Sequence, residues 1–216
     1  MSNITGARMF AQLDEAFAAR DRHFSVSPLL GQRAPYVYER CLESLHLTGD
    51  IAECGVAGGE TSAELLRLLE RQQNSKILHL FDTFEGLPDL ATEEELAACV
   101  GTVLRKGNFA VSEQVVLKRL GTSSLYRIHK GAFSQTFSGF SRPLCFIHAD
   151  ADLYCSTVQI IELADRCLVR GGAVIFDDCR NPETPGVAMA LTRHLDSGKY
   201  HMVTAPSGNQ CFASKR

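Results

Sequence analysis

The chain has 216 residues, of which 45% are hydrophobic and 22% charged, a balance typical of one globular domain with an ample core. Its formal net charge of −3 argues against a nucleic acid or an anionic membrane surface as a partner. The sequence has no apolar run near the roughly 18 residues of a membrane span and no basic-then-apolar N-terminal leader, so we expect a cytoplasmic protein without a membrane partner.

Strand and helix patterns alternate along the chain, which favours an α/β fold with a mostly parallel sheet. Apolar residues at helical spacing predict helices, and short apolar runs predict buried strands. The predicted helices cover residues 7–20, 35–47, 61–72, 112–120, 157–168 and 186–195. The predicted strands cover residues 50–54, 76–82, 125–129, 144–150 and 172–177. A capping-box pattern at residues 92–95 predicts one more short helix.

The C-terminal tail has a different character. Residues 200–205 and 210–213 read as two short strands joined by a turn, which predicts an antiparallel hairpin after the parallel units. We divide the chain into N-terminal helices that act as a cap or lid (residues 1–48) and one domain (residues 49–216). The long polar segment 85–111 is a candidate lid insertion, because loops of that length are usually functional or disordered.

The cysteine pattern predicts reduced thiols. None of the eight cysteines forms a Cys-x-x-Cys pair, and most lie within apolar patterns, where cysteine behaves as a small hydrophobic residue. The seven histidines are scattered without zinc-type spacing. His148 lies within a strand pattern and is predicted to be a core histidine with satisfied hydrogen bonds.

A glycine-rich turn follows the first strand. Gly55, Gly58 and Gly59 let the backbone approach a ligand closely, but their spacing fails the dinucleotide fingerprint and no phosphate-loop lysine follows. The turn carries acidic residues and no basic ones, which favours a cationic or zwitterionic nucleoside such as S-adenosylmethionine over a polyphosphate. Asp82, at the end of the second strand, can accept hydrogen bonds from ribose hydroxyls. A tight structural turn and a capping role for Asp82 are the alternatives.

Weaker candidates surround this turn. Thr61 and Ser62 lie at a helix N-terminus and could hold the methionine carboxylate, although plain helix caps need no ligand. Phe84 and Phe133 could flank the adenine ring, and an ordinary place in the core is the alternative for both.

Two acidic clusters follow two apolar strands. Asp150 and Asp152 come after one strand, and Asp177 and Asp178 come after the next. The carboxyl ends of neighbouring parallel strands converge on one crevice, where clustered carboxylates repel one another unless a cation lies among them. Oxygen ligands favour a hard ion such as Mg²⁺. The alternative is that these acids only mark strand ends and helix starts.

Five motifs together resemble the macrocin O-methyltransferase (TylF-like) family, in order over residues 35–200. They are Glu53-Cys-Gly-Val-x-x-Gly-Gly, Phe81-Asp-Thr-Phe-Glu-Gly-Leu-Pro88, Lys130-Gly-x-Phe133, His148-x-Asp-x-Asp-Leu-Tyr154 and Phe176-Asp-Asp178. The resemblance implies a class I methyltransferase (Rossmann-like) sheet with a C-terminal antiparallel hairpin and helices on both faces. It also implies an enzyme that uses S-adenosyl-L-methionine and Mg²⁺ to methylate a hydroxyl, notably on sugars of secondary metabolites.

The resemblance also assigns roles to residues. It implies that Asp152 is the general base. The implied metal ligands are Asp150, Asp177 and Asp178. Glu53, Gly55 and Asp82 match the cofactor site of the family. Together with the candidates near them, the predicted cofactor residues are Glu53, Gly55, Gly59, Thr61, Ser62, Asp82, Thr83, Phe84, Gly131, Phe133 and Asp150.

The chemistry agrees with these assignments. A bound Mg²⁺ lowers the pKa of a hydroxyl, and a nearby carboxylate takes its proton. If the strand continues past Asp150, alternation points Asp150 and Asp152 the same way; an N-cap role is the alternative for Asp152. We expect a small-molecule hydroxyl acceptor as the partner, no nucleic acid, and a possible homo-oligomer. A haloacid-dehalogenase-type Mg²⁺ phosphatase, a sugar-nucleotide transferase and a non-catalytic S-adenosylmethionine-binding protein are the rival functions.

Overall fold

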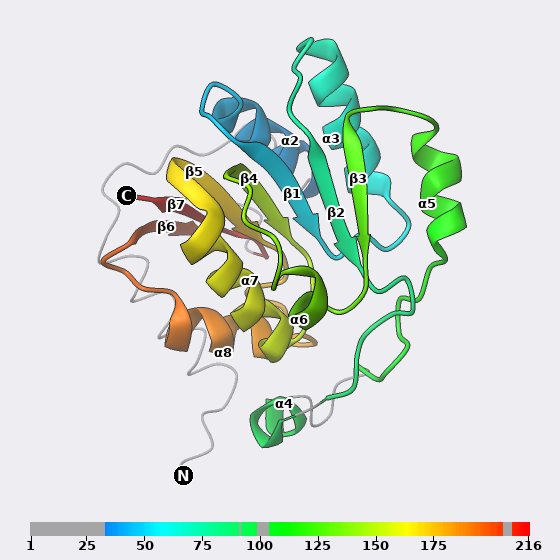
Figure 1. Ribbon diagram of the computed structural model, residues 1–216. Coiled ribbons are helices and arrows are strands. Elements are labelled where there is room, and N and C mark those ends of the chain that lie inside the picture. The colour runs from blue at the N-terminus through cyan, green and yellow to red at the C-terminus, as the bar shows by residue number, and fades with distance from the viewer. Residues whose placement is uncertain (1–32, 91, 99–103, 205–208) are drawn as a thin grey trace.

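The computed structural model describes residues 33–90, 92–98, 104–204 and 209–216 (Figure 1). The predicted helix at residues 7–20 lies outside the described residues. A seven-stranded sheet has the order β3-β2-β1-β4-β5-β7-β6. Its strands are β1 (Asp50–Cys54), β2 (Leu78–Asp82), β3 (Tyr126–Lys130), β4 (Leu144–Ala149), β5 (Leu168–Phe176), β6 (Tyr200–Thr204) and β7 (Cys211–Lys215).

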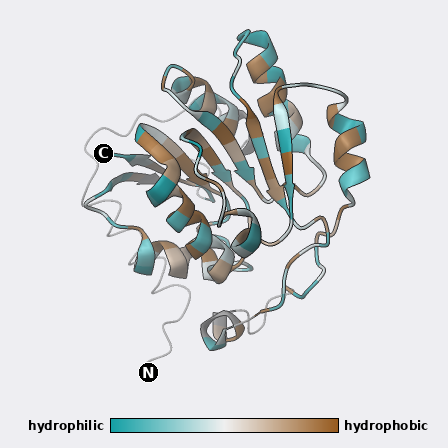
Figure 2. Ribbon diagram, viewed as in Figure 1, coloured by the Kyte–Doolittle hydropathy of each residue, from teal (hydrophilic) through white to brown (hydrophobic). Residues whose placement is uncertain are grey.

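The strand directions confirm the predicted sheet. Strands β1 to β5 pair in parallel, β7 runs antiparallel to β5, and β6 runs antiparallel to β7. Strands β1 and β4 are buried along their whole length, as expected of the centre of a parallel sheet covered on both faces. Figure 2 shows these central strands as largely hydrophobic, whereas the edge strand β3 carries hydrophilic residues.

Helices cover both faces of the sheet (Figure 1). Side chains alternate along each strand, so Ile51 joins the core under one layer of helices and Ala52 joins the core under the other. One layer comprises α2 (Arg33–Ser44), α3 (Glu60–Arg71) and α5 (Glu113–Leu120). The other comprises α6 (Phe133–Thr136), α7 (Tyr154–Cys167) and α8 (Pro185–His194). In the described part of the chain no helix is long and apolar enough to cross a membrane.

The strand register brings four chain segments to one edge of the sheet. Ala149 pairs with Cys54 on one side and with Phe176 on the other, so the residues that follow these strands are neighbours. Backbone hydrogen bonds extend the pairing, from Asp150 N–H to the Cys54 carbonyl (2.8 Å) and from Asp177 N–H to the Ala149 carbonyl (2.8 Å). The loops after β1, β2, β4 and β5 therefore meet at this carboxyl edge.

The segment after β2 extends away from the sheet. Figure 1 shows the described parts of residues 85–111 (85–90, 92–98 and 104–111) leaving the carboxyl edge, with the short helix α4 (Glu93–Ala98) at the far end. The start of the segment pairs with its return, since Leu87 N–H donates to the Asn108 carbonyl (2.9 Å) and Gly107 N–H donates to the Leu87 carbonyl (2.9 Å). These bonds fix the base of the segment beside the edge of the sheet.

The prediction that all cysteines are reduced thiols is wrong for one pair. Cys179 and Cys211 form a disulfide, with a Cα–Cα distance of 6.1 Å and a sequence separation of 32. The antiparallel pairing of β7 with β5 sets Cys211 opposite Phe176, three residues before Cys179, which brings the two sulfur atoms within bonding reach. The free cysteines of the described chain are half-buried or buried, and Cys99 lies outside the described residues.

Candidate active site

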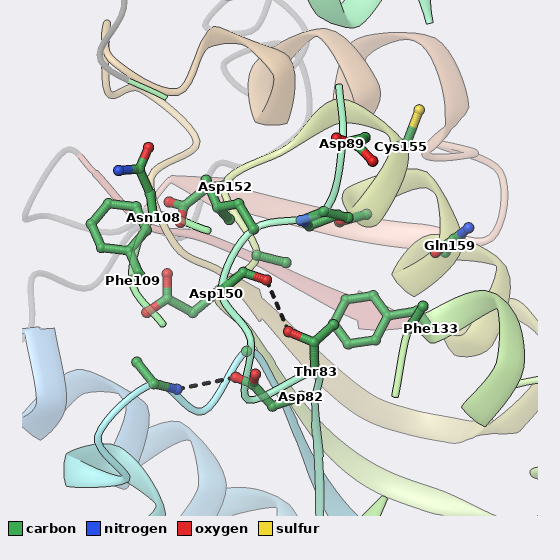
Figure 3. A pocket seen from close by; sticks show the side chains of 18 of the residues that line it. Asp82, Thr83, Asp89, Asn108, Phe109, Phe133, Asp150, Asp152, Cys155 and Gln159 are labelled. Atoms are coloured by element: carbon green, nitrogen blue, oxygen red, sulfur yellow. Dashed lines mark hydrogen bonds between the residues drawn. The ribbon is translucent and has the colours of Figure 1, made fainter. Parts of the chain in front are cut away.

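A cavity of about 440 Å³ opens at the carboxyl edge of the sheet (Figure 3). Its walls come from the loops after β1 to β5, the start of α7 and the segment after β2. None of the described residues that line it is a lysine or an arginine, so it favours a cationic or neutral ligand. The lining residues are Gly55, Ala57, Asp82, Thr83, Gly86, Leu87, Pro88, Asp89, Asn108, Phe109, Ala132, Phe133, Ser134, Asp150, Ala151, Asp152, Cys155, Ser156, Gln159 and Asp178.

The turn after β1 forms one wall. Gly55 adopts a φ of +89°, and a Cβ atom there would lie 1.8 Å from the carbonyl oxygen of Asp150, so only glycine fits. The Asp82 carboxylate accepts hydrogen bonds from the backbone N–H groups of Val56 (2.7 Å), Ala57 (3.1 Å) and Phe84 (2.7 Å). Asp82 therefore fixes the glycine-rich turn while one side of its carboxylate faces the cavity.

The predicted cofactor residues fall into two groups. Five of them line the cavity: Gly55, Asp82, Thr83, Phe133 and Asp150. The other six do not line it: Glu53, Gly59, Thr61, Ser62, Phe84 and Gly131.

Two of the residues that do not line the cavity have clear structural roles. Phe84 is buried in the core beneath α2 and α3, where the alternative interpretation placed it. Ser62 is fully buried, and its hydroxyl donates to the Glu53 carboxylate.

Three carboxylates gather on the other side of the cavity. Oxygen atoms of Asp150, Asp152 and Asp178 lie within 4.8 Å of one another, and all three side chains are half-buried. The condition for strand alternation between Asp150 and Asp152 is not met, because β4 ends at Ala149, one residue before its predicted end. A tight turn brings Asp152 back to Asp150 instead, with a φ of +56° at Asp152 and a hydrogen bond from Leu153 N–H to the Ala151 carbonyl (2.5 Å).

The alternative role for Asp152 as a helix cap does not apply. The N-cap residue of α7 is Leu153, and its side chain makes no capping hydrogen bond. Asp178 also adopts a left-handed backbone, with a φ of +57°. Aspartate tolerates this region better than most residues, and such conformations concentrate at functional sites.

A second set of polar side chains lies beneath the cavity, in the interior. His148 Nδ1 lies 3.2 Å from Glu53 Oε1, and His148 Nε2 lies 3.0 Å from Asp177 Oδ2. The Gln210 amide N–H donates to the other Asp177 oxygen, while the buried Gln210 carbonyl oxygen has no partner among the described residues. All four side chains are at least 97% buried. We call Glu53, His148, Asp177 and Gln210 the buried network.

His148 is held as a cation in this network. Burial alone would lower its pKa, but the charge and hydrogen bond of Asp177 and those of Glu53 outweigh burial and raise the pKa well above its ordinary value. A charged imidazolium between two carboxylates attracts both and offsets one of their two negative charges in a place that water does not reach. The prediction that His148 is a satisfied core histidine agrees with this geometry.

The structure therefore separates the predicted metal ligands. Asp178 lies with Asp150 and Asp152, whereas Asp177 points into the buried network. Asp177 keeps a connection to the cluster, because His148, Asp150 and Asp177 also offer possible ligand atoms within 4.8 Å of one another.

Several lining residues were not singled out by the sequence. Asn108 and Phe109 come from the return of the segment after β2, and Gln159 comes from the first turns of α7. The one available signal was the glycine before Asn108, which marks a turn, but nothing in the sequence says that this turn returns to the site.

The chain matches the family model of the macrocin-O-methyltransferases (TylF) over residues 18–204. It belongs to this family. A search of curated proteins finds no match. Among solved structures, the chain is similar to the O-methyltransferase NovP, with a TM-score of 0.75 and 19% identity over 97% of this chain and 98% of that one.

Two further solved structures have a fold similar to that of this chain. The calicheamicin methyltransferase CalS11 matches with a TM-score of 0.69 and 20% identity, covering 96% of this chain and 79% of that one. An O-methyltransferase from Bacillus cereus in complex with SAH matches with a TM-score of 0.56 and 16% identity, covering 96% and 90%. These similarities confirm the predicted class I methyltransferase fold.

Proposed function

We propose that the protein transfers the methyl group of S-adenosylmethionine to a hydroxyl of a small molecule, a sugar of a secondary metabolite. The observation that carries the proposal is one cavity with two different sides. A glycine turn fixed by Asp82 forms one side, and the carboxylates of Asp150, Asp152 and Asp178 form the other. Membership in an O-methyltransferase family supports the reaction, and the sugar-modifying relatives support the acceptor class. One solved CalS11 structure is of a TDP-rhamnose 3'-O-methyltransferase.

The donor fits the side formed by Gly55, Asp82, Thr83 and Phe133. S-adenosylmethionine supplies the methyl group on a positively charged sulfur. The described lining of the cavity has several carboxylates and no basic side chain, which favours that cation. A polyphosphate such as ATP would meet repulsion there.

The acidic cluster fits a hard cation. Three carboxylates within 4.8 Å repel one another, and Mg²⁺ prefers such oxygen ligands. Asp150 and Asp178 would hold the ion, which when bound lowers the pKa of the acceptor hydroxyl. In this proposal Asp177 supports the cluster from the interior, because both of its oxygens already accept hydrogen bonds from His148 and Gln210.

Asp152 would act as the general base. Its carboxylate lies beside those of Asp150 and Asp178 and faces the same cavity. The acceptor oxygen bonds to the methyl carbon as the carbon–sulfur bond breaks, and the bonding pair stays on sulfur. Asp152 takes the hydroxyl proton, a transfer typically worth about 10²–10⁴-fold in rate.

Binding and turnover test the proposal. S-adenosylhomocysteine should bind and raise the melting temperature, whereas NADH and ATP should not. With labelled S-adenosylmethionine and Mg²⁺, the protein should methylate at least one member of a panel of glycosides, including TDP-rhamnose. Chelation with EDTA should stop the transfer, and added Mg²⁺ should restore it.

Three outcomes would contradict parts of the proposal. Tight ATP or NADH binding without S-adenosylhomocysteine binding would overturn the methyltransferase assignment. Full turnover in excess chelator would contradict a role for the metal. S-adenosylhomocysteine binding without turnover on any acceptor would favour the non-catalytic binding protein. The phosphatase and sugar-nucleotide transferase alternatives find no support in the comparisons. Homo-oligomerisation stays a prediction, which light scattering would check.

A further inference from the structure

The aromatic ring of Phe109 lines the cavity and is exposed to solvent. Phe109 is 60% exposed, and among the described residues no other phenylalanine or tyrosine is exposed. Figure 3 shows its ring beside Asn108 on the side of Asp152, with Phe133 on the opposite side of the cavity. Covering an apolar ring that is exposed to water is favourable, so a ligand that covers Phe109 binds more tightly.

The backbone at Phe109 is in a strained conformation. Phe109 adopts a φ of +62°, a left-handed conformation that side chains with a Cβ rarely take. The flanking turn is fixed by the bonds of Leu87 with Asn108 and Gly107, and Ala110 N–H donates to the Gly107 carbonyl (3.3 Å). Glycine at position 109 would remove the strain, so a local folding requirement does not explain the phenylalanine.

We propose that Phe109 is a specificity-determining residue on which the sugar ring of the acceptor stacks. The inference rests on the proposed methyl transfer to a sugar hydroxyl. A sugar ring has an apolar C–H face and a rim of hydroxyls. Stacking that face on Phe109 directs the rim toward Asp150 and Asp152, which lie on the same side of the cavity in Figure 3, and toward Asp178, which lies with them. Phe133, across the cavity, is left to the donor.

Removal of the ring is the first test. Phe109→Ala should raise KM for the best glycoside of the panel about tenfold, the effect expected for the loss of one stacking contact. The kcat value should change less than KM, and the dissociation constant of S-adenosylhomocysteine should stay the same. Phe109→Tyr should restore the acceptor KM. Leu117→Ala, which removes an exposed side chain from α5, is the matched control and should change neither constant.

Glycine at the same position separates function from folding. Phe109→Gly should lose acceptor affinity as Phe109→Ala does, while its melting temperature stays equal to or above that of the wild type. An unchanged acceptor KM in both variants would overturn the proposal. A parallel loss of S-adenosylhomocysteine affinity would also overturn it, because the ring would then serve the donor.

A fluorescence experiment keeps the inference separate from the proposed reaction. The chain has no tryptophan, so Phe109→Trp places a single fluorophore at the site. TDP-rhamnose or p-nitrophenyl rhamnoside should change its emission in a saturable way, even if no methyl group is transferred. S-adenosylhomocysteine binding without turnover would contradict the proposed function and leave the role of Phe109 in place. The absence of any saturable change with either glycoside would end the role of Phe109.

Discussion

The carboxylates at the cavity and those of the buried network lie a few ångströms apart, but they differ in burial and in their partners. Asp150, Asp152 and Asp178 are half-buried, face a cavity and lie close enough together to repel one another. Asp177, next to Asp178 in the chain, is buried and paired with His148 and Gln210. The position of an acid at a strand end therefore does not decide its role. What decides it is whether the interior already satisfies the charge.

The largest effect should come from breaking the buried network. His148→Ala leaves Glu53 and Asp177 buried without a cation between them, and removing one partner of a buried charge pair costs about 3–5 kcal/mol. Urea denaturation should show that loss in the free energy of unfolding. His201→Ala, on the exposed side of β6, is the control and should change little. A loss below about 1 kcal/mol for His148→Ala would mean that the network is not a unit.

The disulfide ties the two groups together, and its removal should be the next largest effect. Cys179 follows Asp178, and Cys211 follows Gln210. Closing a loop of 32 residues stabilises a fold by about 3 kcal/mol. Cys211→Ser should therefore lower the unfolding free energy by about that amount, and reduced wild-type protein should match the variant. Equal stability of the oxidised and reduced wild type would contradict this expectation.

A mutation in the cluster of Asp150, Asp152 and Asp178 should have the opposite effect to one in the buried network: turnover should fall while stability is kept. Asp152→Asn should lose at least about 10²-fold in turnover, because the amide cannot take the proton. Its stability should stay within about 0.5 kcal/mol of the wild type, since the side chain faces the cavity. Glu162→Gln, exposed on α7, controls for the loss of a charge. Normal turnover by Asp152→Asn would make Asp152 dispensable, and loss of Mg²⁺ binding would make it a ligand.

Lowering the pH should have the smallest effect on stability, and this effect comes from His129, outside both groups of carboxylates. Burial and the neighbouring His79 lower the pKa of His129 from 6.5 to about 4. The unfolded chain then binds the proton more readily, so the stability that the neutral ring contributes is present above pH 6.5 and is lost as pH falls toward 4. Because the ring is partly exposed, we expect a loss on the order of 1 kcal/mol. His129→Gln should reduce the slope of stability against pH in this window, and an unchanged slope would contradict the assignment.

The sequence predicted well the elements that are buried on all sides. Strand β1 has the predicted bounds, Asp50–Cys54. Strand β5 begins at Leu168, four residues before its predicted start, because Gly171 and Gly172 resemble a loop. Helix α6 was not predicted, since its four residues are too few to show a helical period.

The candidate site was predicted by residue type and less well by orientation. The acids at the strand ends and the glycine turn were found because their chemistry is visible in the sequence. The division between Asp177 and Asp178 depends on the left-handed backbone at Asp178, which no spacing reveals. The disulfide and the place of Phe109 depend on chain segments that meet only after folding.

The contact between Gly55 and Asp150 has a consequence for how this enzyme family changes its acceptors. The backbone of the donor turn touches the backbone that carries the acidic cluster, with no room for even a methyl group between them. In the proposed function, this contact sets the spacing from the methyl donor to the reacting hydroxyl. New acceptors would then be accommodated by the segment that carries Phe109, so libraries aimed at new substrates should vary residues 104–111 and leave the strand ends unchanged.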